Sequence, residues 1–355
     1  MRRMWIGVGL VGVAALAVAL SGCADVRYLT QAAGGQLDLL RRARPIPDVL
    51  ADPATSAAVR RKVQLAADVR AFAIRPTAQG GLGLPDHGSF QKYVDVGRPY
   101  VVWNVFSAPE FSVQLDTSCF PIAGCVGYRG YFNEAAAQAY AQERRAAGRD
   151  VNVGGVSAYS TLGYLQDPLL STMLGYPDAT LIRTVIHELS HPSLYVPGDT
   201  VFNESYATTV EEEGMRRWLA VHGTPELREA DRLAQERSAG FETLLLAARR
   251  ELETLYAQTL PDAEMRARKV AVLSGMNARY AALKASWGGY DGYDAFFARG
   301  VNNATLGAVA AYATMVPDFQ ALLARVGGDL PRFIEGATVC GGRPPGERAA
   351  CLRGE

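Results

Sequence analysis

The sequence predicts an α+β fold, in which a mixed sheet precedes an active-site helix and a mainly helical C-terminal part follows. Strand-like and helical runs alternate over residues 97–155, and two amphipathic helical stretches begin near Asp178 and Asn203. Of the 355 residues, 49% are hydrophobic. That share is enough for a sizeable core, in one large or two smaller domains.

The first 22 residues resemble a bacterial lipoprotein signal peptide. Two arginines precede an apolar run over residues 4–20, and Cys23 follows the small-residue exit of that run. The run is short for a membrane span, so an uncleaved anchor helix is the less favoured alternative. Cleavage would leave Cys23 lipidated in the cell envelope. Ala24 favours the outer membrane, facing the periplasm, under the sorting rule of Gram-negative lipoproteins.

Residues 23–95 are predicted to form a helical and linker segment. Helical periodicity starts at Tyr28, is interrupted by two prolines, and resumes over residues 57–73. The glycine-rich stretch at 80–85 lacks the lysine and the helix start of a phosphate-binding loop. It is therefore predicted to be a plain loop.

The central part of the fold covers residues 96–223. A β-branched and aromatic run at 100–106 predicts a strand, residues 134–147 predict a helix, and residues 151–156 predict a second strand. The helix that follows should begin at Asp178 as its N-cap. Residues 224–355 are predicted to be helical and to complete the same unit.

The helix from Asp178 carries the sequence His-Glu-Leu-Ser-His at 187–191. Residues four apart share one face of an α-helix, so His187 and His191 can bind one metal ion while Glu188 faces a water molecule. This HExxH spacing is typical of zinc hydrolases. The alternative is a helix that uses these side chains for packing. Pro192 predicts a kink at the second histidine.

A third ligand is expected on the next helix, which should start near Asn203. Glu204 is the candidate, because a carboxylate on a helix after HExxH completes the tetrahedral site of glutamate-type zinc peptidases. Glu211 and Asp199 are the reserves. Glu211 shares a face with Glu204, and could support a ligand or bind a substrate amine. The combination predicts a zincin-like fold of the gluzincin type.

In that architecture an edge strand next to the active-site helix binds extended peptide, and residues 151–159 are the candidate. A phenol commonly stabilises the oxyanion in such sites, which makes Tyr159, Tyr206 and Tyr312 candidates beside their alternative role in packing. His87 and His222 are assigned to the surface or to helix caps.

The balance of charges limits the kinds of macromolecule that the protein is expected to bind. Lysine plus arginine and aspartate plus glutamate number 36 each, without a basic cluster, so nucleic acid is not an expected partner.

The cysteines other than Cys23 lack zinc-knuckle spacing, and an oxidising compartment favours disulfides. Of three pairings, proximity in the sequence favours Cys119–Cys125 with Cys340–Cys351.

Several ordered motifs together resemble the bacterial predicted aminopeptidase family of zinc-dependent lipoproteins, over roughly residues 73–323. The motifs are Cys119-Phe120-Pro121, residues 124–132, residues 154–163, residues 187–191, Gly198-Asp199-Thr200, residues 202–207 and Asn302-Asn303-Ala304. The resemblance implies zinc on His187 and His191, Glu188 as the catalytic base and Glu204 as the last ligand. Pro192 departs from the family, in which a non-proline residue is common.

The expected function is therefore zinc-dependent hydrolysis of peptide bonds at the cell envelope, by glutamate-assisted attack of zinc-bound water, with one Zn²⁺ as cofactor. The resemblance favours an aminopeptidase. Two alternatives stay open, which are an envelope endopeptidase and a non-catalytic, lipid-anchored binding or scaffold protein with a vestigial metal site.

Overall fold

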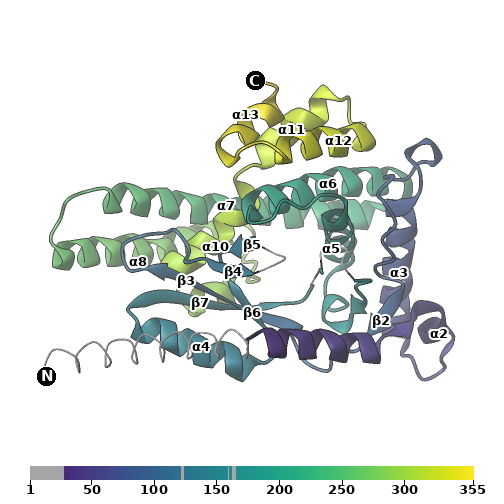
Figure 1. Cartoon of the computed structure of the whole chain (residues 1–355), viewed down its shortest axis with the longest axis horizontal. Helices are drawn as coiled ribbons and strands as arrows, with labels where there is room; N and C mark the ends of the chain where they lie inside the picture. Colours follow the sequence, from purple (N-terminus) through teal and green to yellow (C-terminus); the bar gives the residue numbers. More distant parts are fainter. Residues whose placement is uncertain (1–27, 121–123, 159, 162–164) are drawn as a thin grey trace, which may run out of the picture.

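A computed structural model of the chain describes residues 28–120, 124–158, 160–161 and 165–355 (Figure 1). It is a mixture of helix and sheet in which helix predominates. The predicted signal peptide, Cys23 and Tyr159 lie outside the described residues. In the part of the chain that is described, no helix is long and apolar enough to cross a membrane.

The N-terminal segment is helical, as predicted. Residues 28–42 form a helix, and α2 (Ile46–Ala51) and α3 (Ala57–Ile74) follow it. Ser56 caps α3 by accepting a hydrogen bond from the Val59 amide. Three short strands, β1 (Arg44–Pro45), β2 (Lys92–Val94) and β8 (Leu169–Leu170), form a small sheet in the order β1-β2-β8.

The main sheet has the strand order β6-β3-β7. Its strands are β3 (Val102–Pro109), β6 (Arg129–Tyr131) and β7 (Arg149–Val156), and both pairings are antiparallel. Helix α4 (Glu134–Ala146) connects β6 to β7, which run in the same direction on either side of β3. The sheet is thus antiparallel rather than mixed, because β3 separates the two strands that the helix joins.

The two faces of this sheet have different roles. Trp103, Val105 and Val151 pack with α4 in a separate apolar cluster. Val102 and Asn104 alternate with them along β3 and face the opposite side. On that side a hairpin of β4 (Ser118–Phe120) and β5 (Gly124–Val126) is closed by the Cys119–Cys125 disulfide.

Helix α5 (Asp178–Ser190) is the central helix of the main core and packs against α3 and α6 (Thr200–His222). Ile182, Val185, Ile186 and Leu189 are buried along one side of α5, as their spacing predicts. Asp178 is the first helical residue rather than the cap. Its carboxylate instead accepts two hydrogen bonds from Arg61, which places the charge pair at the start of the helix.

The C-terminal part contains two helical groups (Figure 1). Helices α7 (Pro225–Tyr256) and α8 (Asp262–Ser286) pair into a long hairpin, with α9 (Asp294–Ala298) near its end and α10 (Asn303–Ala313) packed on β3 and β7. Helices α11 (Val316–Arg325), α12 (Leu330–Gly341) and α13 (Arg348–Arg353) cover α6. The Cys340–Cys351 disulfide joins α12 to α13, so both disulfides are those that proximity favours.

Candidate metal centre

Three side chains from two neighbouring helices converge on one point. His187, His191 and Glu204 each offer one ligand atom, and these atoms lie within 4.8 Å of one another. Glu204 Oε2 is 3.3 Å from His187 Nε2 and 3.9 Å from His191 Nε2. Two imidazoles and one carboxylate are the donor set of catalytic zinc sites that keep one position open. The cluster is therefore compatible with a bound metal ion.

Pro192 ends α5 without displacing the second histidine. His191 keeps helical angles, φ −54° and ψ −41°, and begins a 3₁₀ turn over His191–Ser193. Hydroxyl groups satisfy the carbonyls at this helix end, since Ser190 Oγ donates to the His187 carbonyl over 2.7 Å and Ser193 Oγ donates to the Ser190 carbonyl. The expected kink is thus a change from α to 3₁₀ geometry.

A series of ionic contacts orients His187 from the Nδ1 side of its ring, away from the metal position. Its Nδ1 lies 3.1 Å from Glu211 Oε2, and Glu211 Oε1 accepts from Arg183 over 3.3 Å. Arg183 also donates two hydrogen bonds, 2.6 and 3.0 Å long, to the buried Asp231 of α7. Because Nδ1 donates its proton to Glu211, the Nε2 lone pair is directed at the metal position.

Burial and charge separate the pKa values of the two histidines. Burial would lower the pKa of His187, but its hydrogen bonds with Glu204 and Glu211 raise it well above the ordinary value. Burial lowers the pKa of His191 to about 4. His191 Nδ1 is buried and has no hydrogen-bond partner among the described residues. The two histidines of the metal-free site therefore differ, since the pKa of His187 is raised and the pKa of His191 is lowered.

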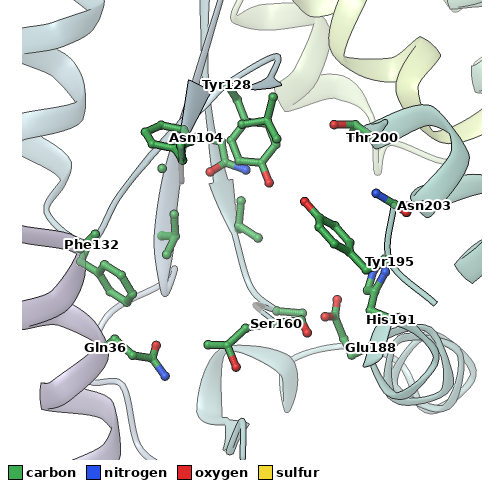
Figure 2. Close-up of a pocket in the computed structure, with 18 of the residues that line it drawn as sticks. Gln36, Asn104, Tyr128, Phe132, Ser160, Glu188, His191, Tyr195, Thr200 and Asn203 are labelled. Carbon is green, nitrogen blue, oxygen red and sulfur yellow. The ribbon is translucent and has the colours of Figure 1, made fainter. Parts of the chain in front are cut away.

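Glu188 occupies the position that a catalytic base requires. Its side chain lines the same cavity as both histidines and is directed into it in Figure 2. Burial raises the pKa of Glu188 to about 7, and the charges of Glu204 and Asp167 act in the same direction. A carboxyl group with this pKa can accept and return a proton near neutral pH.

Asp199, a reserve ligand, has a different role. Helix α6 begins at Thr200, three residues before the predicted start, and Asp199 caps it by accepting from the Phe202 amide over 3.0 Å. The other carboxylate oxygen of Asp199 pairs with Arg348 of α13. Asp199 is therefore corrected from a possible ligand to a helix cap, since both of its oxygens already have partners.

The cluster lies at one end of a cavity of about 630 Å³ (Figure 2). The walls are α5 and α6, one face of the main sheet, the β4–β5 hairpin and, opposite the metal centre, the helix of residues 28–42. Among the described residues that line it, the charged or titratable ones apart from tyrosine are His187, Glu188, His191 and Glu204. All four belong to the metal end.

The three predicted tyrosines do not supply a phenol that the structure places in this cavity. Tyr206 is fully buried, hydrogen-bonds Ser193 over 2.7 Å and stacks on Phe333. It follows Glu204 by two residues, about 200° around the helix, so it faces the core instead. Tyr312 belongs to α10, but its side chain, like Tyr159, lies outside what the structure describes.

Two other tyrosines have their hydroxyl groups in the cavity. Tyr195, from the loop after the 3₁₀ turn, and Tyr128, from the turn after β5, are both directed into it in Figure 2. Sequence patterns do not reveal these two tyrosines, because aromatic residues in loops have no periodicity. For Tyr195 the available signal was its position, four residues after His191. His87 and His222 are exposed, as expected.

The predicted substrate strand is only partly open. β7 is an edge strand of its sheet, but α10 packs beside it and Asn302 donates a hydrogen bond to the Val151 carbonyl over 3.1 Å. The opposite end of the segment is in the cavity wall, where Val156 and Ala158 line it. Peptide could therefore reach residues 156–158 more readily than the start of β7.

Comparisons with known proteins agree with these observations. No curated protein and no solved structure matches the chain. A family model described as "Putative aminopeptidase" matches residues 27–352. That match includes α5, α6 and every wall of the cavity. The chain therefore belongs to this aminopeptidase family.

Proposed function

We propose that the protein is a zinc-dependent peptidase of the cell envelope that acts as an aminopeptidase. The observation that carries the proposal is the convergence of His187, His191 and Glu204 beside Glu188, at one end of a cavity large enough for peptide side chains. A purely structural metal site needs ligands but no base, whereas this site has a buried carboxyl group with a pKa of about 7.

Each residue of the site has a separate role in the proposed hydrolysis. When bound, zinc acts as a Lewis acid that polarises the scissile carbonyl and makes water acidic enough to attack near pH 7. Glu188 takes the proton of the attacking water and passes it to the leaving amine. The Tyr195 hydroxyl donates a hydrogen bond to the carbonyl oxygen as negative charge develops there. Glu211 keeps His187 in the tautomer that can bind the metal.

The proposal extends to the fold and the location. Consecutive helices that supply HExxH and a glutamate ligand, beside an antiparallel sheet, support a zincin-like arrangement of the gluzincin type. The signal-peptide pattern that ends at Cys23 supports a lipid anchor on the periplasmic side of the outer membrane. The helix of residues 28–42 would then connect the anchor directly to the cavity wall.

The distribution of charge in the cavity favours a second candidate, an endopeptidase. An aminopeptidase needs an acidic group for the substrate ammonium, and the carboxylates among the described lining residues are Glu188 and Glu204, which the reaction already uses. Glu211, the third candidate for such a contact, is occupied by His187 and Arg183. Peptides with a free and with an acetylated N-terminus distinguish the two activities.

The test measures metal content and hydrolysis on the same samples. Wild type should bind one zinc ion and cleave peptides, while Glu188→Gln should keep the zinc and lose about 10²- to 10⁴-fold in kcat. Glu204→Gln should lose the metal. Glu226→Gln, at an exposed position of α7, is the matched control and should change neither quantity. Hydrolysis by wild type without zinc, or by Glu188→Gln at the wild-type rate, would refute this mechanism.

A further inference from the structure

The helix of residues 28–42 forms the wall of the cavity that lies opposite the metal centre. Leu29, Ala32, Ala33 and Gln36 line the cavity from this helix. In Figure 2, Gln36 and Phe132 stand across the cavity from Glu188 and His191. A segment about 150 residues before the metal ligands thus forms part of the cavity wall.

Specific contacts hold this wall in place. The side-chain amide of Gln31 pairs with the main chain at β6, since Nε2 donates to the Gly130 carbonyl over 3.2 Å and Oε1 accepts from the Phe132 amide over 3.1 Å. The Phe132 ring lies directly against Gly35, where a Cβ atom would be 2.1 Å from the ring. Tyr28 stacks on Phe120 with ring centroids 5.1 Å apart.

Gln36 contrasts with Gln31 on the same helix. Gln36 is 9% exposed, and neither its Nε2 nor its Oε1 has a hydrogen-bond partner among the described residues. Its amide is turned from the helix toward the side of the cavity that holds Ser160 (Figure 2). A buried amide without partners is destabilising, and native proteins contain few of them. A ligand that supplies both a donor and an acceptor would account for it.

The surroundings of Gln36 define the chemistry of that ligand. Leu29 and Ala33, on the same helix as Gln36, and Phe132, at the same end of the cavity in Figure 2, are uncharged. The charged lining residues among those described lie at the metal end, so an ionic group beside Gln36 would be desolvated without a counter-ion. A primary amide donates and accepts, and its best neutral partner is another amide.

We propose that Gln36 is a specificity-determining residue, which pairs with an amide group of the peptide substrate at the wall opposite the metal. The amide belongs either to a glutamine or asparagine side chain or to a main-chain peptide unit of the substrate. This inference rests on the proposed function, because it names the substrate group that the same cavity selects.

The test compares Gln36→Leu with wild type on a set of internally quenched peptides. The peptides carry glutamine, leucine or lysine at each position around the cleaved bond, and a further series carries single N-methylated peptide bonds. Gln36→Leu should lower kcat/KM about tenfold to a hundredfold. A loss confined to the glutamine peptides assigns the side-chain amide. A loss shared by all peptides and reproduced by one N-methylation assigns the main chain.

Two controls separate recognition from structure. Gln36→Leu removes an unpaired buried amide and should leave the melting temperature equal or higher, whereas Gln31→Leu breaks two hydrogen bonds and should lower it. Zinc content should stay at the wild-type level in both. Equal kcat/KM values for Gln36→Leu and wild type on every peptide would overturn the proposal. So would a Gln31→Leu variant with the same altered peptide ranking.

Measurements of peptide binding test the role of Gln36 without relying on hydrolysis. The same peptides are titrated calorimetrically into zinc-loaded Glu188→Gln, with and without Gln36→Leu. A tenfold or larger loss of affinity on adding Gln36→Leu supports the role of Gln36 even if wild type hydrolyses no peptide, which would refute only the proposed function. Unchanged affinity overturns the role of Gln36 even if wild type is an active peptidase.

Discussion

The two ends of the cavity differ in the polarity of the side chains that line them. At the metal end, titratable side chains of α5, the 3₁₀ turn and α6 contact one another, and Arg183 and Asp231 support them from behind. At the opposite end, the helix of residues 28–42 presents an apolar wall with one unpaired amide. If the protein is the peptidase proposed above, charge is concentrated where the peptide bond would be cleaved, and the uncharged far wall would contact the rest of the substrate.

If this division holds, a change at either end should affect one property and leave the other intact. Variants at the metal end should alter metal affinity or the chemical step, with little change in which peptide is preferred. Variants at the far wall should alter peptide preference and leave metal affinity unchanged. Single variants at each end of the cavity test this separation.

After Glu188→Gln, the largest loss of kcat is expected for Tyr195→Phe. If the hydroxyl of Tyr195 stabilises the developing oxyanion, its removal should lower kcat by about 10²- to 10³-fold with little change in KM or zinc content. Steady-state kinetics on one cleaved peptide and metal analysis provide the measurement. A variant that keeps the wild-type kcat would remove Tyr195 from the mechanism.

Tyr206→Phe is the matched control on the neighbouring helix. It loses the hydrogen bond to Ser193 and should cost about 0.5–1.5 kcal/mol in the free energy of unfolding, with kcat unchanged. Chemical denaturation of the metal-free protein measures this loss. A drop in kcat without a drop in stability would instead restore Tyr206 as a catalytic candidate.

These two tyrosines show what sequence patterns can and cannot predict here. The spacing of His187, Glu188 and His191 is a local property, and the buried side of α5 is confirmed for the same reason, although the helix begins one residue before its predicted first turn. The packing role left open for Tyr206 is the one the structure supports, because Tyr206 lies about 200° around α6 from Glu204 and is buried in the core. Tyr195 lies in a loop, where hydrophobic periodicity does not predict the direction of a side chain.

The far wall was beyond prediction for a different reason. The periodicity of residues 28–42 indicates a helix, but nothing in it indicates that this helix packs near residues 187–204. The contacts that fix it, between Gln31 and β6 and between Gly35 and Phe132, are about 100 residues apart in sequence. Only tertiary packing brings Gln36 to the cavity.

Glu211→Gln tests whether Glu211 supports zinc binding through His187. The variant removes the charge that holds the His187 proton on Nδ1, and zinc affinity should fall about 10- to 100-fold while the peptide preference stays the same. Competition with a chelator of known affinity gives the measurement. Glu212→Gln is the control, because Glu212 contacts Gln320 rather than the histidines. Equal affinities for both variants would contradict the role of Glu211.

The same pair of variants predicts a pH dependence. In the metal-free protein the pKa of His187 is well above its ordinary value, so zinc must displace a proton at pH 7. Zinc affinity should therefore rise with pH, by up to about tenfold per unit, until the pKa of His187 is passed. Glu211→Gln loses one of the hydrogen bonds that raise this pKa, so its affinity should level off at lower pH. Zinc titrations from about pH 5.5 to about pH 9 would show this difference between the variants.

Gly35→Ala tests the other end of the cavity, and its effect on KM should be smaller than the effects of Tyr195→Phe on kcat and of Glu211→Gln on zinc affinity. A Cβ atom at this position would be 2.1 Å from the Phe132 ring, so the helix of residues 28–42 must shift outward. Overpacking of this kind costs about 1–3 kcal/mol in the free energy of unfolding, and the displaced wall should change KM severalfold. Because no metal ligand belongs to this helix, zinc affinity should stay at the wild-type value. A parallel loss of zinc affinity in Gly35→Ala would mean that the two ends are coupled through the sheet, and the division of labour between them would have to be abandoned. Gly34→Ala, one residue earlier with no atom within 4 Å of its Cβ position, is the control and should leave KM and zinc affinity unchanged, with stability equal or slightly higher because alanine favours the helix.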